Sequence, residues 1–137
     1  MMDEKIPAKQ LSFAPPLELA GAIIGELSKT KAAGLKLIHV ENQTIIADYF
    51  IICTGTSNTQ IRALANNLEF KIGEGGVFPS HIEGLDEATW VLLDYGSVIV
   101  HIFNSETRRF YNLEKLWVDG AELDITQYLS NQDENQL

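Results

Sequence analysis

Residues 90–103, WVLLDYGSVIVHIF, constrain the possible fold more than any other part of the sequence. They contain two apolar runs, each of strand length, with Tyr95 and Gly96 between them. Glycine is a common turn residue, and apolar runs on both sides of a tight turn indicate a β-hairpin. We therefore predict a hairpin with a two-residue turn at Tyr95 and Gly96.

The two faces of this predicted hairpin differ in character, because side chains along a strand point alternately to opposite sides. In this register Trp90 lies opposite His101. Asp94 lies opposite Ser97 on the same face, which therefore mixes apolar and polar groups. The other face is entirely aliphatic and belongs in the core: Val91, Leu93, Val98, Val100 and Ile102.

Distance excludes a catalytic dyad of Asp94 and His101 on the mixed face. In the predicted register His101 lies four residues along the strand from the position opposite Asp94, roughly 13 Å at about 3.3 Å per residue. A hydrogen bond needs about 3 Å. We therefore interpret His101 as a hydrogen-bonded histidine beside Trp90.

Helical and strand patterns alternate along the rest of the chain. After two prolines, apolar residues recur at helical spacing, and Gly34 is placed to end this first helix. Strand patterns follow in residues 35–40 and within residues 45–58. Ser57 and Gln60 form a capping box before a second helix. The apolar face of that helix comprises Ile61, Leu64, Ala65, Leu68 and Ile72.

The second half adds a short strand before the hairpin and helices after it. Pro79 makes the strand in residues 77–84 either an edge strand or an interrupted one, because proline cannot donate to the ladder. Residues 104–117 indicate one or two short helices. The order predicts a single α/β domain with a mixed β-sheet of about five strands flanked by helices. We divide the chain into a flexible arm (1–16), a folded domain (17–119) and an acidic, disordered tail (120–137).

Composition excludes several classes of protein. No apolar run approaches the roughly 18 residues that span a bilayer, and the N-terminus lacks the features of a signal peptide. We expect a cytoplasmic protein without a membrane partner. The net charge is −9, and ten lysines and arginines are scattered along the chain. We therefore expect little direct contact with nucleic acid and attraction to a basic protein.

Three other features are typical of chemical sites. Cys53, the single cysteine, precedes a predicted helix as a nucleophile would, but it lies in an apolar strand, where a thiol is usually inert. Residues 55–58, GTSN, resemble a phosphate-binding turn without the lysine of a P-loop. A nucleotidyltransferase also needs two carboxylates on one strand, and no predicted strand supplies them. The three histidines lie on separate predicted strands, so we expect no metal site.

Aromatic residues and arginines concentrate in the last third of the chain. Tryptophan, tyrosine and arginine are enriched at the energetic centres of protein interfaces. These rings either fill the core or form an exposed patch, and for the group as a whole we predict a patch. The group comprises Trp90, Tyr95, Arg108, Arg109, Phe110, Tyr111 and Trp117.

Three blocks of the sequence resemble the ribosomal silencing factor family, also called the Iojap-related proteins. These blocks are DYFIICTGTSN, WVLLDYGSVIVHIF and ETRRFYNLEKLW, and the resemblance runs from about residue 17 to 118. Ser97 stands where the family often has aspartate. The resemblance implies a nucleotidyltransferase-like fold without the catalytic carboxylates, and hence neither enzymatic activity nor a cofactor.

The resemblance also implies a function and a site. Family members bind protein uL14 of the large ribosomal subunit, block joining of the small subunit and repress translation under nutrient limitation. A homodimer of the free protein is also expected. The alternatives are a large-subunit assembly factor and a nucleotide-binding, transferase-like enzyme using GTSN. Carried onto this chain, the predicted partner-binding residues are Trp90, Leu92, Asp94, Tyr95, Arg109, Tyr111, Glu114 and Trp117.

Overall fold

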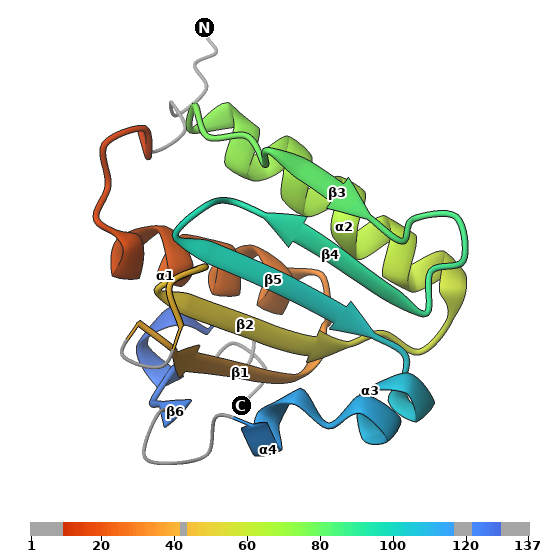
Figure 1. Ribbon diagram of the computed structural model, residues 1–137. Coiled ribbons are helices and arrows are strands. Elements are labelled where there is room, and N and C mark those ends of the chain that lie inside the picture. The colour runs from red at the N-terminus through yellow and green to blue at the C-terminus, as the bar shows by residue number, and fades with distance from the viewer. Residues whose placement is uncertain (1–9, 42–43, 117–121, 130–137) are drawn as a thin grey trace, which may run out of the picture.

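The computed structural model of the chain describes residues 10–41, 44–116 and 122–129. Within these residues six strands form one mixed sheet, in the order β3-β4-β5-β2-β1-β6 (Figure 1). The two long helices lie behind the sheet in this view. The strands are β1 (Ala33–His39), β2 (Tyr49–Thr54), β3 (His81–Glu83), β4 (Trp90–Asp94), β5 (Val98–Phe103) and β6 (Glu122–Leu123). The helices are α1 (Pro16–Lys29), α2 (Asn58–Glu74), α3 (Ser105–Tyr111), α4 (Leu113–Leu116) and the 3-10 helix η1 (Thr126–Tyr128).

The predicted α/β architecture with a mixed sheet is confirmed, with one strand more than we expected. β2 and β5 pair in parallel, whereas the other neighbouring strands are antiparallel. The additional strand, β6, lies in the segment that we expected to be a disordered tail, and it pairs with β1. Leu123 and Tyr128 pack against the main core. Apolar side chains therefore order residues 122–129, despite the acidic composition of the surrounding segment.

The main core lies between the sheet and the two long helices. α2 buries the five apolar residues that its spacing predicted. At its start, the Ser57 hydroxyl accepts a hydrogen bond from the Gln60 N–H at 3.0 Å. The Gln60 side chain reaches back one residue further than in the usual capping box, because its Oε1 accepts from the Thr56 N–H at 2.5 Å. The predicted helix start is thus confirmed.

The first helix ends earlier than predicted, at Lys29 and not at Gly34. Lys31 takes the left-handed conformation, with φ of 74°, that we had assigned to glycine. The Ala32 N–H then donates to the Leu27 carbonyl at 3.0 Å and closes the helix end. Gly34, also left-handed at 58°, lies inside β1, where the pairing with β2 is irregular.

The hairpin is confirmed, but its predicted register was wrong by two residues. Trp90 pairs with Phe103, and the Tyr95 N–H donates to the Val98 carbonyl at 2.9 Å. Gly96 is therefore the first central residue of the turn, with φ of 86°. A tyrosine is strained in that conformation and glycine is not. Because the error is an even number of residues, every strand side chain keeps its predicted face.

The ends of the described structure add two smaller findings. β3 is an edge strand, as predicted, and Pro79 precedes it instead of interrupting it. Leu11, which we had assigned to the flexible arm, is buried in the main core, and its N–H donates to the Gly75 carbonyl at 2.8 Å. No helix among the described residues is long and apolar enough to cross a membrane.

Candidate docking face

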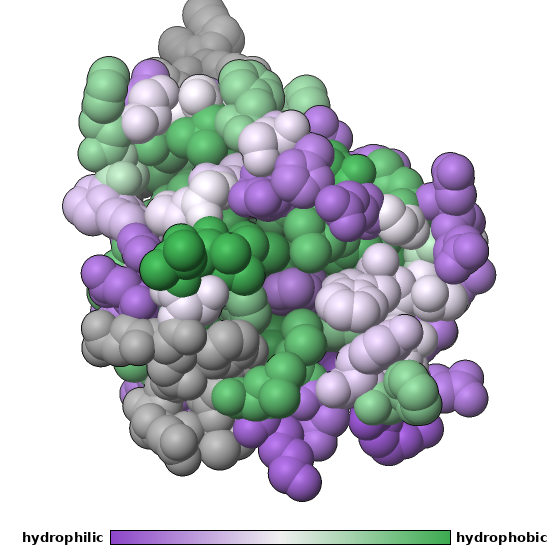
Figure 2. All heavy atoms as spheres, viewed as in Figure 1, coloured by the Kyte–Doolittle hydropathy of each residue, from purple (hydrophilic) through white to green (hydrophobic). Residues whose placement is uncertain are grey.

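The sheet has a second face, turned away from α1 and α2, on which aromatic rings gather. Alternation along β1, β2, β4 and β5 places their side chains there. Figure 2 views the molecule from this side and shows apolar side chains across the middle of the face, with hydrophilic ones above and below. We call it the aromatic face, and its strand residues are Ile38, Phe50, Ile52, Trp90, Leu92, Ile99, His101 and Phe103.

Trp90 occupies the centre of these ring contacts. Its ring centroid lies 4.9 Å from that of Phe103 and 4.8 Å from that of Tyr111 in α3. Its indole N–H donates to Nδ1 of His101 at 3.1 Å. Trp90 itself is half-buried, whereas 51% of the Tyr111 surface is exposed. The pair therefore presents a partly exposed aromatic surface held by contacts from the sheet.

His101 is buried beneath this surface, with only 4% of its surface exposed. Because Nδ1 accepts the tryptophan hydrogen bond, Nε2 carries the proton of the neutral ring. Nε2 is buried and has no hydrogen-bond partner among the described residues. Burial lowers the pKa of His101 to about 4, so the ring is neutral at physiological pH. The hydrogen bond from Trp90 agrees with our interpretation of His101, but the unpartnered Nε2 shows that the ring is only half satisfied among the described residues.

The carboxylate of Asp94 bonds elsewhere, so the excluded dyad is also unformed in the observed register. Asp94 Oδ1 accepts a hydrogen bond from the Gly96 N–H at 2.8 Å. Its other oxygen lies 3.7 Å from Nε2 of His81, across the β3–β4 pair. Asp94 thus stabilises the hairpin turn and borders the aromatic face without contacting His101.

An arginine clamp fixes the helical segment beside the aromatic face. Arg108 donates two hydrogen bonds to Oε2 of Glu114, at 2.8 and 3.1 Å, and a third to the Thr54 hydroxyl at 2.7 Å. Asn112 makes this possible, because its left-handed conformation, with φ of 49°, turns the chain between α3 and α4. Partial burial alone would raise the pKa of Glu114, but the hydrogen bond and charge of Arg108 outweigh it, and the pKa is lowered.

The structure brings together most of the predicted partner-binding residues, with different roles. Trp90, Leu92 and Asp94 share the face, and Tyr111 packs on Trp90. Arg109 is exposed on α3. Trp117 lies outside the described residues.

Two of the predicted partner-binding residues, Tyr95 and Glu114, are instead engaged in contacts within the fold. Tyr95 is only 8% exposed and packs in the main core, because the observed register extends the strand pairing to it. Its ring is therefore unavailable to a partner. Glu114 is engaged by Arg108, the residue that sequence reasoning missed as an anchor.

Most of an exposed apolar rim was also missed, and only its Phe110 belonged to the predicted patch. The rim comprises Ile45, Ile46, Phe110 and Leu116, whose side chains are largely exposed. Ile46 directly precedes Ala47, which packs against the aromatic face, and Phe110 contacts Tyr111 edge-on at 5.0 Å. The run of isoleucines before β2 was the available signal, but it was indistinguishable from a buried strand.

The remaining chemical candidates are accounted for by packing. Cys53 is fully buried, and burial raises the pKa of its thiol to about 12. Such a thiol is protonated and unreactive at neutral pH. In the GTSN turn, the Gly55 N–H donates to the Phe103 carbonyl at 2.9 Å, and Ser57 caps α2. Among the residues that the structure describes, no group of three acidic, histidine or cysteine side chains is arranged to hold a metal ion.

These features define an acidic α/β domain in which helices cover one face of the sheet. On the other face, Trp90, Leu92 and the ring of Tyr111 stay partly exposed over a smaller cluster of buried side chains. Comparison with known proteins identifies the domain further. Residues 14–136 match the family described as "Ribosomal silencing factor during starvation", and the chain belongs to that family. The match continues past residue 118, where the resemblance in our sequence analysis ended.

Individual relatives agree with this assignment. A Bacillus subtilis (strain 168) protein named ribosomal silencing factor RsfS is 41% identical over 95 residues, which cover 69% of this chain and 80% of that protein. A mouse protein named "Mitochondrial assembly of ribosomal large subunit protein 1" is 34% identical over 98 residues, 69% of this chain and 43% of that protein. A crystal structure of a Chromobacterium violaceum protein, 33% identical, aligns with a TM-score of 0.73 and covers 75% of this chain and 86% of that one.

Proposed function

We propose that this protein is a cytoplasmic ribosomal silencing factor that binds protein uL14 of the large ribosomal subunit and sterically blocks joining of the small subunit. Translation is thereby repressed under nutrient limitation. The family match over residues 14–136 carries this proposal. The mechanism requires occupancy of a surface and no chemical turnover, so the protein acts without a cofactor and not as an enzyme.

The aromatic face is the proposed contact surface. Large rings that are already held in place bind a partner with little loss of conformational entropy. The contact set comprises Trp90, Leu92, Asp94, Arg109 and Tyr111, with Trp117 retained from the family resemblance. Glu114 acts indirectly by holding Arg108, and Tyr95 is withdrawn from the set because it is buried.

Charge favours a protein partner over ribosomal RNA. The net charge of −9 attracts a basic ribosomal protein and is repelled by exposed phosphates. An interface of ordinary size, about 800 Å² on each partner, occupies enough space to exclude another subunit.

Co-sedimentation tests the proposal. The protein is centrifuged with isolated large subunits, isolated small subunits and joined ribosomes, and we expect it to pellet with free large subunits alone. Tyr111→Ala should reduce this binding at least tenfold, because it removes a partly exposed ring from the face. Phe70→Ala is the matched control, since Phe70 is an exposed ring on α2, behind the sheet. Failure to pellet with any subunit would overturn the proposal.

An assembly role is the second candidate, and the name of the mouse relative favours it. It uses the same face but differs in its consequence. Deleting the gene should then cause immature large subunits to accumulate, whereas pure silencing changes only the fraction of joined ribosomes. Sucrose-gradient profiles of the deletion strain distinguish the two.

We further propose that the free protein forms a homodimer through the aromatic face, and that ribosome binding competes with dimerisation. The largely exposed apolar rim supports this, because such surface is usually covered by a partner. Analytical ultracentrifugation should give a dimer for the wild type and a shift toward monomer for Tyr111→Ala. A wild-type monomer at every concentration would contradict it.

A further inference from the structure

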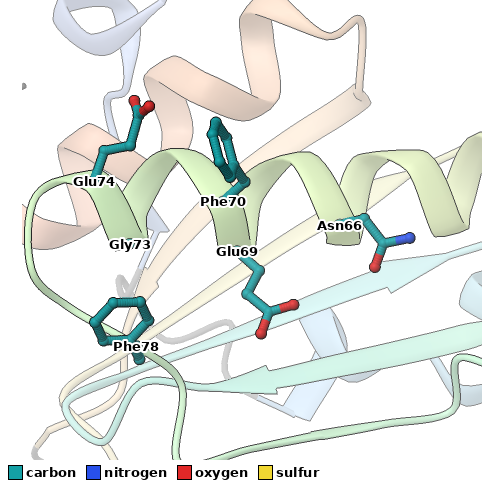
Figure 3. Close-up of a pocket in the computed structure, with 6 residues that line it drawn as sticks. All are labelled: Asn66, Glu69, Phe70, Gly73, Glu74 and Phe78. Carbon is teal, nitrogen blue, oxygen red and sulfur yellow. The ribbon is translucent and has the colours of Figure 1, made fainter.

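Two phenylalanines are exposed at the far end of α2. Phe70 lies in the helix and is 64% exposed, and Phe78 lies in the connection to β3 and is 68% exposed. Gly73 lies between them, and together they border an open hollow of about 430 Å³ (Figure 3). We call this hollow the α2 notch, and its lining residues are Asn66, Glu69, Phe70, Gly73, Glu74 and Phe78.

Residue 73 has no side chain, and the ring of Phe78 packs directly against its backbone. A Cβ atom at this position would lie 2.7 Å from Cε1 of Phe78, so any larger residue would displace that ring or fill the space beside it. Glycine within a helix costs about 1 kcal/mol relative to alanine. Gly73 therefore lowers the stability of the helix but lets the Phe78 ring lie against it, where that ring forms one wall of the notch.

The lining is acidic as well as apolar. Figure 3 shows Glu74 and Phe70 extending from one side of the helix, and Glu69 extending on the side of Phe78. Lys71 lies 4.0 Å from Glu74 and 6.0 Å from the centre of the Phe70 ring, and so offsets part of the charge of Glu74. Glu69 has no ion pair among the described residues. A carboxylate without a cationic partner thus borders the space between the rings.

We propose that the α2 notch is a second docking site, which takes an apolar side chain flanked by lysine or arginine from a basic segment of another protein. The open hollow that the two rings border accommodates the apolar side chain. Glu69 and Glu74 pair with the flanking cations. A second copy of this chain seated notch to notch is a poor occupant, because it would bring Glu69 and Glu74 against the same carboxylates.

The position of the notch gives this site a separate use from the aromatic face. α2 covers one face of the sheet and the aromatic face lies on the other. Both sites can be occupied together, so a protein bound through its aromatic face still presents the notch to a second partner.

Peptide titration observed by amide NMR tests the proposal on the full chain. The probe is a capped peptide with a central leucine between two lysines on each side. The matched peptides replace either the lysines with glutamates or the leucine with alanine. We expect the lysine–leucine peptide alone to shift the amides of residues 66–78, and added salt to weaken its binding because exposed charges are screened.

Two variants assign the binding to the notch. Glu69→Gln keeps the size of the side chain and should weaken peptide binding several-fold, with a smaller salt dependence. Phe70→Ala should weaken it about tenfold. Both residues contribute little to the core, so the melting temperature and co-sedimentation with large subunits should stay unchanged.

Four outcomes of the peptide titration would overturn the proposal. Two concern the peptides: the absence of shifts at residues 66–78, and equal binding of the acidic peptide. The third is unchanged peptide binding by both variants. The fourth is peptide binding that requires removal of residues 1–9, which would make that segment the natural occupant. Self-association abolished by Phe70→Ala would assign the notch to a second copy and would also overturn it. Large-subunit binding is measured separately, so failure here leaves the silencing proposal intact.

Discussion

The two faces of the sheet are built from the same strands but differ in how completely they are buried. On the helix-covered face, α1 and α2 bury aliphatic side chains such as Leu93 and Val100 completely. On the aromatic face, rings pack on one another, a histidine nitrogen is left without a partner among the described residues, and Trp90 and Leu92 remain partly exposed. Strand alternation creates two faces. The helices bury one of them completely, whereas on the other Trp90 and Leu92 stay accessible above a smaller buried cluster.

The largest expected effect comes from neighbouring leucines on opposite faces. Leu93→Ala should lower the free energy of unfolding by about 2–5 kcal/mol, because it leaves a cavity beneath the helices. Leu92→Ala should cost about 1 kcal/mol, since its side chain is already partly exposed, yet it should weaken large-subunit binding more. Urea unfolding and co-sedimentation measure the two effects. Equal destabilisation by both variants would remove the distinction between the faces.

Acid should destabilise the aromatic face through His101. Its folded-state pKa of about 4 lies below the ordinary value of 6.5, so the unfolded chain binds the proton more readily. The stabilisation is fully present above pH 6.5 and is lost as the pH falls toward 4, by up to about 3 kcal/mol.

The control for this pH effect is His101→Leu, which cannot titrate. This variant also loses the hydrogen bond from Trp90, which lowers its stability at every pH. The quantity to compare is therefore the change in the free energy of unfolding between pH 7 and pH 5, measured by urea unfolding. The variant should lose less stability over this range than the wild type. Identical pH dependence would mean that another group is responsible.

Arg108→Lys should have a moderate effect, on the edge of the aromatic face. Lysine keeps the charge but cannot make the forked contact with Glu114 while also reaching Thr54. We expect a loss of about 1.5 kcal/mol in stability. Large-subunit binding should also weaken, because Tyr111 is carried by the same helix. Thermal melting and co-sedimentation check this, and a variant with wild-type affinity would show that the clamp does not position the face.

Ile46→Ala should have the smallest effect on stability, within about 0.5 kcal/mol, because its side chain is largely exposed. If the docking surface extends to the segment before β2, this change should still reduce large-subunit affinity several-fold. Leu129→Ala provides a control at an exposed apolar residue outside the aromatic face and its rim. Unchanged binding by Ile46→Ala would limit the surface to the hairpin and α3.

The sequence predicted the two faces because strand periodicity is insensitive to an even error in register. The turn itself was misplaced, because two adjacent residue pairs could have closed it and only backbone conformation distinguishes them. That error placed Tyr95 in the turn, whereas it packs in the core. The helix face of α2 was predicted in full, since its spacing and cap lie within one continuous segment.

Long-range contacts were beyond the reach of such patterns. The Arg108–Glu114 clamp depends on a left-handed Asn112 and on Thr54, which is distant in sequence. β6 was missed because a two-residue strand has no measurable periodicity, and it is fixed only by pairing with β1. Residue types alone therefore predicted which side chains belong to the candidate site. Neither spacing nor composition predicted the contacts that hold those side chains in place.

The parallel pairing of β2 with β5 has a consequence for how the chain folds. These central strands are separated in sequence by α2, β3 and β4, so they can meet only after a long loop has closed. The β4–β5 hairpin, in contrast, can form from neighbouring residues. During synthesis, the inner edge of β2 lacks its native partner until residues 98–103 have left the ribosome, so the newly made N-terminal half is the stage most exposed to aggregation.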